Sequence, residues 1–274
     1  MKKISRRSFL AAAAVSVAAL AMTACGGSAS SAASSVASSA ASSEAASSAA
    51  AADLTTVEAG KLTMATNAAF PPYEMTTDAG EFEGIDVDTA KAIAEKLGLE
   101  LQIDDMDFDA ALLSVQQGKA DIVMAGVTVT DERKAVMDFS DSYATGIQSI
   151  IVPNDSDIAS PDDLAGKKIG TQRGTTGYIY CSDDFGDENV VAYDDGLTAV
   201  QALNNGQVDA VVIDNAPAQE FVAANPGLKV LDTSYAEEDY AIGMAKGSAL
   251  EDAVNKALEE LKADGTLQAI VDKY

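Results

Sequence analysis

The sequence predicts an α/β protein of two lobes with similar architecture, each built from parallel strands and crossover helices. Apolar strand patterns alternate with helical patterns through residues 57–274, which is typical of parallel sheets. Residues 111–126 align without gaps to residues 199–214, so one helix–strand unit occurs twice. The 274 residues are also enough for two domains with cores of their own.

The first lobe is expected to begin with a strand and a helix. Leu62 and Met64 alternate with polar residues, which is typical of a half-buried strand. Asp86 can cap the following helix and Gly98 can end it. The apolar face of this helix consists of Val87, Ala90, Ala94 and Leu97.

A second strand–helix pair is expected to follow. Apolar residues alternate again over 99–103, and residues 108–117 favour a helix that Gly118 closes. The apolar run at 121–125 is typical of a strand that is covered on both faces.

The repeat also predicts where a ligand binds. Gly118 and Asp121 of the first copy correspond to Gly206 and Asp209 of the second. Ligands of open α/β sheets bind beyond the carboxyl ends of the strands, and Gly126 and Asp214 occupy that position. We therefore expect a cleft between facing lobes that brings these two ends together.

Residues 1–24 are predicted to be an export signal. Four basic residues precede an uncharged stretch at 9–24, which is shorter than the about 20 apolar residues of a membrane span. The stretch ends in small residues before Cys25 and resembles a bacterial lipobox, so Cys25 is the expected lipidation site. Arg6 and Arg7 also resemble a twin-arginine export motif. The alternative is a stray cysteine in a plain signal peptide or a membrane anchor.

Residues 25–56 are predicted to be a flexible linker behind the lipid anchor. Residues 26–52 include 12 alanines and 11 serines, and nothing in them can bury an apolar face. A random coil of this length reaches roughly 30 Å.

The charge and composition exclude several function classes. The chain has 18 basic and 43 acidic residues, a net charge of −25, which repels nucleic acid. It contains no histidine, so histidine-dependent triads and histidine-ligated zinc are excluded. Without the four basic residues of the signal, 14 basic and 43 acidic residues remain, which gives a net charge of −29. The two remaining arginines, Arg133 and Arg173, are expected to face the cleft.

The residues after the first apolar strand can bind a carboxylate. Gly126 permits close approach to a ligand, Thr128 offers a hydroxyl, and Arg133 offers a planar fork that matches a carboxylate. Alternatively, Thr130 caps a helix and Arg133 pairs with a surface acid.

The second lobe contributes a loop and an acid. The loop at 171–177 is followed by a helix, so its backbone amides can form an anion seat; the alternative is an ordinary turn. Asp214 ends an apolar strand, where a charge needs a partner such as an ammonium group; the alternative is helix capping. Phe70 and Phe108 can flank a ligand side chain or belong to the core.

Six segments carry a family resemblance. They are TNAAFPPY (66–73), GIDVD (84–88), MAGVTVTDER (124–133), DFS (138–140), RGTTG (173–177) and ADGT (263–266). In this order and spacing they resemble the family 3 bacterial extracellular solute-binding proteins, the polar amino-acid receptors of ABC importers.

The resemblance implies a type II periplasmic-binding-protein fold, in which two α/β lobes joined by two hinge strands close around one ligand. Residues 57–144 and 240–274 would form the first lobe and residues 145–239 the second. The hinge crossings would lie near 143–146 and 239–242.

The resemblance also assigns the ligand-binding residues. Arg133, helped by Thr128 and Thr176, would bind an α-carboxylate, while Asp214 and the carbonyl of Gly126 would bind the α-ammonium. The other implied positions are the aromatic pair Phe70 and Phe108, and Asn67, Ala125 and Gln172 at the side-chain end. Thr175, in the loop at 171–177, is a further candidate.

The expected function is the extracytoplasmic substrate-binding component of an ABC importer, working with a permease and an ATPase. The lipid on Cys25 would hold it at the cell membrane, as in a Gram-positive bacterium. Glutamine, arginine and cystine are open as ligands: Asn67 and Gln172 suit an uncharged polar side chain, whereas Glu74, Asp107 or Asp109 can supply a carboxylate.

The sequence is also compatible with two other functions. The fold resembles that of cyclohexadienyl dehydratases, where Asp214 or Asp109 would act as the acid. The chain can also be the ligand-sensing input of a separate signalling protein. No catalytic group, cofactor or metal is expected, and Cys181 is left without a disulfide partner.

Overall fold

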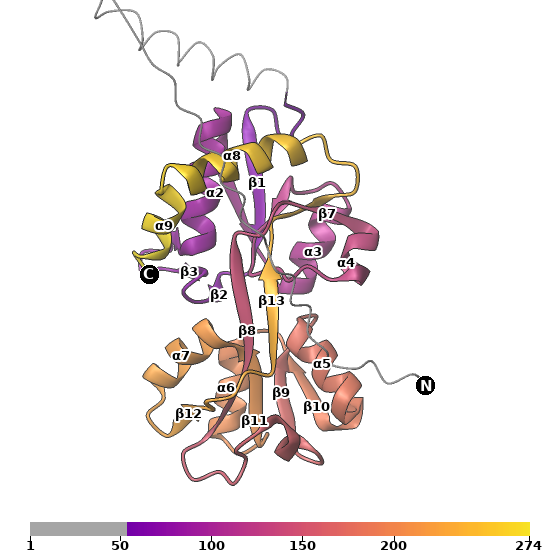
Figure 1. The fold of residues 1–274 in the computed structure, drawn as a ribbon, viewed down its shortest axis with the longest axis vertical. Helices are drawn as coiled ribbons and strands as arrows, with labels where there is room; N and C mark the ends of the chain where they lie inside the picture. Colours follow the sequence, from indigo (N-terminus) through magenta and orange to yellow (C-terminus); the bar gives the residue numbers. More distant parts are fainter. Residues whose placement is uncertain (1–53) are drawn as a thin grey trace, which may run out of the picture. The chain divides into compact units, whose positions relative to one another are not determined.

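The computed structural model describes residues 54–274. The predictions for the export signal, for Cys25 and for all but residues 54–56 of the linker lie outside the described residues. The described chain forms two larger sheets and one small sheet, with helices packed against them (Figure 1).

The first sheet has the strand order β5-β1-β6-β14-β7. β1 pairs in parallel with β5 and β6, whereas β14 is antiparallel to β6 and β7. The strands are β1 (Lys61–Thr66), β5 (Glu100–Asp105), β6 (Ile122–Val123), β7 (Met137–Phe139) and β14 (Gly243–Ala245). The helices of this part are α2 (Ile85–Leu97), α3 (Phe108–Gln116), α4 (Asp131–Val136), α8 (Glu251–Ala263) and α9 (Thr266–Val271).

Helices cover both faces of β1, so the prediction of a half-buried strand at Leu62 and Met64 is wrong. These two side chains pack with apolar residues of α2 and α8, such as Ile93 and Leu258. On the opposite face, Ala65 packs with Val115 of α3. The strand itself is confirmed, but its polar residues Thr63 and Thr66 are buried as well.

Helix α2 confirms the predicted apolar face and the predicted end. All four residues of that face are buried, and Gly98 caps the helix with a left-handed backbone, φ 70°. The prediction that Asp86 caps the helix is wrong, because Gly84 occupies the cap. Asp86 is buried inside the first turn, where it accepts hydrogen bonds from Gly126 N (3.0 Å) and Tyr143 Oη (2.8 Å).

The second sheet has the order β10-β9-β11-β8-β12, and β13 also pairs with β8. Its strands are β8 (Ala144–Pro153), β9 (Ile169–Gln172), β10 (Val190–Tyr193), β11 (Ala210–Asp214), β12 (Leu228–Val230) and β13 (Ala236–Tyr240). The helices are α5 (Thr176–Phe185), α6 (Gly196–Asn204) and α7 (Asn215–Ala224), with short 3₁₀ turns at Pro161–Leu164 and Asp187–Asn189.

The internal repeat has the same geometry in both sheets. Asp121 precedes β6, and its Oδ2 accepts from Thr63 N at 2.8 Å. Asp209 precedes β11, and its Oδ2 accepts from Lys168 N, also at 2.8 Å. In each copy the aspartate that precedes the strand therefore accepts a hydrogen bond from a backbone N–H in, or directly before, the neighbouring parallel strand. The strand predicted at 121–125 is shorter than expected, since only Ile122–Val123 is paired.

Two antiparallel strands lie side by side where the chain passes between the sheets (Figure 1). β8 leads into the second sheet and β13 leads back, with Ala144 opposite Tyr240 and Gly146 opposite Glu238. These are the two hinge strands of the predicted fold. The small sheet, β2 (Ala69–Phe70), β3 (Glu74–Thr76) and β4 (Phe82–Glu83), lies between β1 and α2 in the chain.

Within residues 54–274, no helix is long and apolar enough to cross a membrane, and no group of acidic or sulfur side chains is arranged to hold a metal ion. Cys181 is free and buried. Its burial raises the pKa of the thiol to about 12, which makes it a weak nucleophile.

Candidate ligand site

The structure brings all eleven predicted ligand-binding residues to one cavity, together with Glu74. The first-lobe residues are Asn67, Phe70, Phe108, Ala125, Gly126, Thr128 and Arg133. The second-lobe residues are Gln172, Thr175, Thr176 and Asp214. Their convergence follows from the topology, since most lie just beyond β1, β6, β9 and β11. Their roles in binding stay a prediction.

Arg133 is held inside the cavity by backbone oxygens. Thr130 caps α4 by accepting a hydrogen bond from Arg133 N, which is one part of the alternative interpretation. The side chain of Arg133, however, turns inward and is 8% exposed, so it does not pair with a surface acid. Its guanidinium donates to Thr128 O (2.7 Å) and to Gly174 O (3.2 Å), and lies 5.3 Å from the centroid of Phe108. Burial lowers the pKa of Arg133, while the charge of Glu238 opposes that shift.

Asp214 is a buried acid that makes no helix-capping hydrogen bond. Its carboxylate accepts from Tyr240 Oη and from Gln148 Nε2, the latter at 2.8 Å. Burial raises the pKa of Asp214 to about 7, although the hydrogen bond from Tyr240 works in the other direction. A cation in the cavity would favour the ionised form of Asp214, which burial disfavours.

Contacts between the lobes cross the cavity. Gln172 Nε2 donates to Asn67 Oδ1 at 2.9 Å, and the hydroxyls of Thr128 and Thr176 are 3.4 Å apart. The hydrogen bond from Arg133 to Gly174 is a third such contact. The cavity is consequently shaped by both lobes at once.

Glu74 is the most unusual group in the cavity wall. It is 0% exposed, no N–H or O–H group among residues 54–274 donates to its oxygens, and its carboxyl lies within hydrogen-bonding range of the Asp86 carboxyl. Burial, followed by the charge of Asp86, raises the pKa of Glu74 well above its ordinary value. A buried carboxylate without a donor is costly, and a cationic partner would remove that cost.

Glu238 of β13 is hydrogen-bonded to residues of both lobes, and the sequence analysis does not predict it as a site residue. Its Oε2 accepts from Thr128 Oγ1 (3.1 Å), Thr176 Oγ1 (3.0 Å) and Gln148 Nε2 (3.0 Å). The available signal was the alternation in β13, where Glu238 and Tyr240 face inward and their neighbours face outward.

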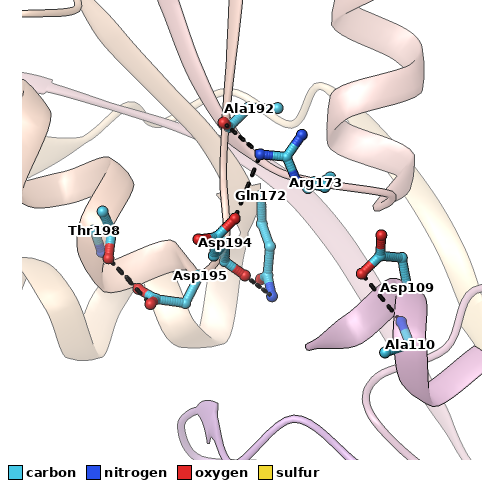
Figure 2. Close-up of polar contacts among 8 residues, drawn as sticks. All are labelled: Asp109, Ala110, Gln172, Arg173, Ala192, Asp194, Asp195 and Thr198. Atoms are coloured by element: carbon cyan, nitrogen blue, oxygen red, sulfur yellow. Dashed lines mark hydrogen bonds and ion pairs between the residues drawn. The ribbon is translucent and has the colours of Figure 1, made fainter. Parts of the chain in front are cut away.

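Three charged residues lie outside the cavity: Arg173, which was expected to face it, and Asp107 and Asp109, two of the three acids that the sequence offers as a nearby carboxylate. Arg173 is exposed and donates to Ala192 O and Asp194 Oδ1, both at 3.4 Å, as Figure 2 shows. Asp107 and Asp109 are also exposed, and Asp109 accepts from Ala110 N (Figure 2). At the start of α3 only Phe108 turns inward, because successive helical residues point in different directions.

Two lobes, two hinge strands and a cavity between sheet ends define a solute-binding protein of the type II periplasmic class. The model of one family, bacterial extracellular solute-binding proteins, family 3, matches residues 62–274. The chain belongs to this family.

Several relatives cover most of the chain. The L-cystine-binding protein TcyJ of Escherichia coli K12 is 34% identical over 79% of this chain and 83% of its own. The arginine-binding extracellular protein ArtP of Bacillus subtilis is also 34% identical, over 78% and 86%. A solved structure of an ancestral arginine-binding protein bound to glutamine is 42% identical, with a TM-score of 0.75, covering 78% of this chain and 97% of that one.

Proposed function

We propose that this chain is the extracytoplasmic substrate-binding component of an ABC importer and binds a polar L-amino acid. One observation carries the proposal: a buried arginine from one lobe and a buried aspartate from the other line the same cavity. A zwitterion satisfies both groups at once. Relatives named for binding cystine and arginine support this ligand class.

In this proposal Arg133, Thr128 and Thr176 bind the α-carboxylate, and Asp214 binds the α-ammonium with the Gly126 carbonyl. Thr175 caps α5, which directs backbone amides toward the carboxylate. The side chain of the ligand lies among the remaining cavity residues, Asn67, Phe70, Glu74, Phe108, Ala125 and Gln172.

Glu74 favours arginine over glutamine as the ligand. A guanidinium or ammonium group would supply the hydrogen-bond donors that both oxygens of Glu74 lack, whereas a neutral amide supplies fewer and no charge. Cystine, with a second ammonium group, also meets this requirement.

The lobes are proposed to comprise residues 57–144 with 240–274, and residues 145–239. The sheet membership of β8 and β13 supports boundaries near 144 and 240. We further propose a lipid anchor on Cys25 at a Gram-positive cell membrane, and a permease and an ATPase as partners.

We propose that the protein is not an enzyme, since the relatives are named as binding proteins. The dehydratase alternative would use Asp214 as a proton donor. Incubation with arogenate or prephenate separates the two functions: unchanged substrate is expected, and formation of an aromatic product would contradict the binding-protein proposal.

The proposal is tested by calorimetry of the purified protein with L-arginine, L-cystine, L-glutamine and the other common amino acids. Stoichiometric binding of arginine is expected, and no binding by any amino acid would overturn the proposal. Glu74→Gln should weaken arginine binding at least about tenfold while changing glutamine binding less. Glu81→Gln, an exposed change near the same small sheet, is the matched control.

A further inference from the structure

Glu238 uses the same hydroxyl groups that the proposed α-carboxylate site requires. Thr128 lies in the first lobe and Thr176 begins α5 in the second, and both donate to one oxygen, Oε2 of Glu238. Glu238 is 6% exposed, so water does not compete strongly for these bonds.

Each threonine hydroxyl has a single hydrogen to donate. A hydroxyl that donates to Glu238 presents only lone pairs to its other neighbours. A carboxylate is an acceptor only, so the ligand would meet oxygen lone pairs at both threonines unless the hydrogens left Glu238.

The charge of Glu238 adds to this conflict. Among the groups around Arg133, Glu238 exerts the largest attractive effect on the guanidinium. The ligand carboxylate would therefore share both its hydroxyl donors and its cation with a carboxylate of the protein. Two carboxylates that draw on the same donors in a buried site repel each other.

We propose that Glu238 competes with the α-carboxylate of the ligand for the hydroxyl hydrogens of Thr128 and Thr176, and so lowers the affinity for amino acids. This inference rests on the proposed function. Glu238 is a positioning residue, because it acts through the two threonines and Arg133. A receptor that delivers its ligand to a transporter needs release as well as binding, and this competition favours release.

A neutral replacement separates competition from a merely structural role. Glu238→Gln keeps the size and one acceptor oxygen of the side chain, but the bond from a hydroxyl to a neutral amide is weaker than to a carboxylate. Both hydrogens should then move more readily to the ligand. L-arginine should bind about tenfold more tightly to this variant, equivalent to about 1.4 kcal/mol.

The second probe is L-argininamide, in which a neutral amide replaces the α-carboxylate. Because it carries no α-carboxylate charge, its affinity should change less than about threefold, so the preference for the acid over the amide should rise. Glu237→Gln, a neighbouring exposed change of equal charge, should leave both affinities unaltered. Melting temperatures establish that all three proteins are folded.

Equal changes for L-arginine and L-argininamide, or weaker binding of L-arginine to Glu238→Gln, would overturn the inference. If the unaltered protein prefers L-glutamine, the same comparison uses L-glutamine and its α-amide. Failure of the unaltered protein to bind any amino acid contradicts the proposed function instead, so the two failures are distinguishable.

Discussion

Arg133 is a buried cation whose hydrogen-bonded partners are two backbone carbonyls rather than an acid. These carbonyls orient the guanidinium without neutralising it. A ligand carboxylate would supply a directly hydrogen-bonded opposite charge, because Glu238 acts on the guanidinium only through space.

Arg133→Met should weaken amino-acid binding at least about 100-fold, since a buried charge-assisted bond is lost. The methionine can still pack against Phe108, so the protein should remain folded. Calorimetry and thermal melting measure the two effects. Arg173→Met, which removes the exposed arginine, should bind normally, and wild-type affinity in Arg133→Met would refute the assignment of the site.

The raised pKa of Asp214 predicts that amino-acid affinity depends on pH. Its pKa is raised to about 7, whereas pairing with an ammonium group requires the ionised form. Affinity should therefore fall by about tenfold or more from pH 8 to pH 5. Calorimetry across this range measures the effect.

Asp214→Asn should bind more weakly at pH 8 and show a much flatter pH profile. It should still bind, because an amide can accept one hydrogen bond from the ammonium. An unaltered pH profile in this variant would assign the titration to another group.

At the scale of elements, the hinge depends on a close contact between its two strands. A Cβ atom at Gly146 would lie 2.4 Å from the ring of Tyr240, which is fully buried. The glycine of β8 thus makes room for a side chain of β13 that also holds Asp214.

Gly146→Ala should lower the free energy of unfolding by about 1–3 kcal/mol, because the buried ring cannot move aside easily. Gly227→Ala is the matched control, since no atom lies within 4 Å of the added Cβ. It should change stability by less than about 0.5 kcal/mol. Chemical denaturation measures both, and equal stabilities would show that Tyr240 adapts at little cost.

The elements that the sequence could predict are those with a local signal. The apolar face and glycine end of α2, the helix predicted at 108–117 and observed at 108–116, and the repeat around Asp121 and Asp209 all depend on neighbouring residues. The predictions that failed concern residues whose partners lie far away along the chain. Asp86 looks like a cap, but its carboxylate binds Gly126 and Tyr143, which lie far along the chain.

The site was predictable where motifs follow strand ends, and less so on the hinge. Glu238 has a carboxylate that meets Thr128 and Thr176 only after both lobes have folded. Arg173 belongs to the same loop motif as the cavity residues, yet its side chain points to Asp194. A motif fixes the position of a backbone segment, but it does not fix the direction of every side chain.

For the molecule as a whole, burial of acids predicts higher stability at mildly acidic pH. Burial raises the pKa of Asp214 to about 7 and of Asp86 to about 6, and raises that of Glu74 as well. The folded state then holds protons that the unfolded chain releases above about pH 4. Stability therefore falls as the pH rises from about 4 to 7.

The melting temperature should be about 5 °C or more higher at pH 5 than at pH 8. Exposed acids with lowered pKa values, such as Asp264 at about 2, act in the opposite direction only below about pH 4. Asp214→Asn should reduce the difference between the two pH values. A melting temperature that rises steadily from pH 5 to pH 8 would contradict this account.

The position of β14 has a consequence for the order of assembly. This strand, Gly243–Ala245, lies between β6 and β7 in the first sheet, although it follows the entire second sheet in the chain. During synthesis or export, about 100 residues follow β7 before β14, the strand that pairs with both β6 and β7, becomes available. The contiguous segment from β8 to β13 contains every strand of the second sheet and can meanwhile complete its own pairings. The part of the protein that is begun first is thus finished last.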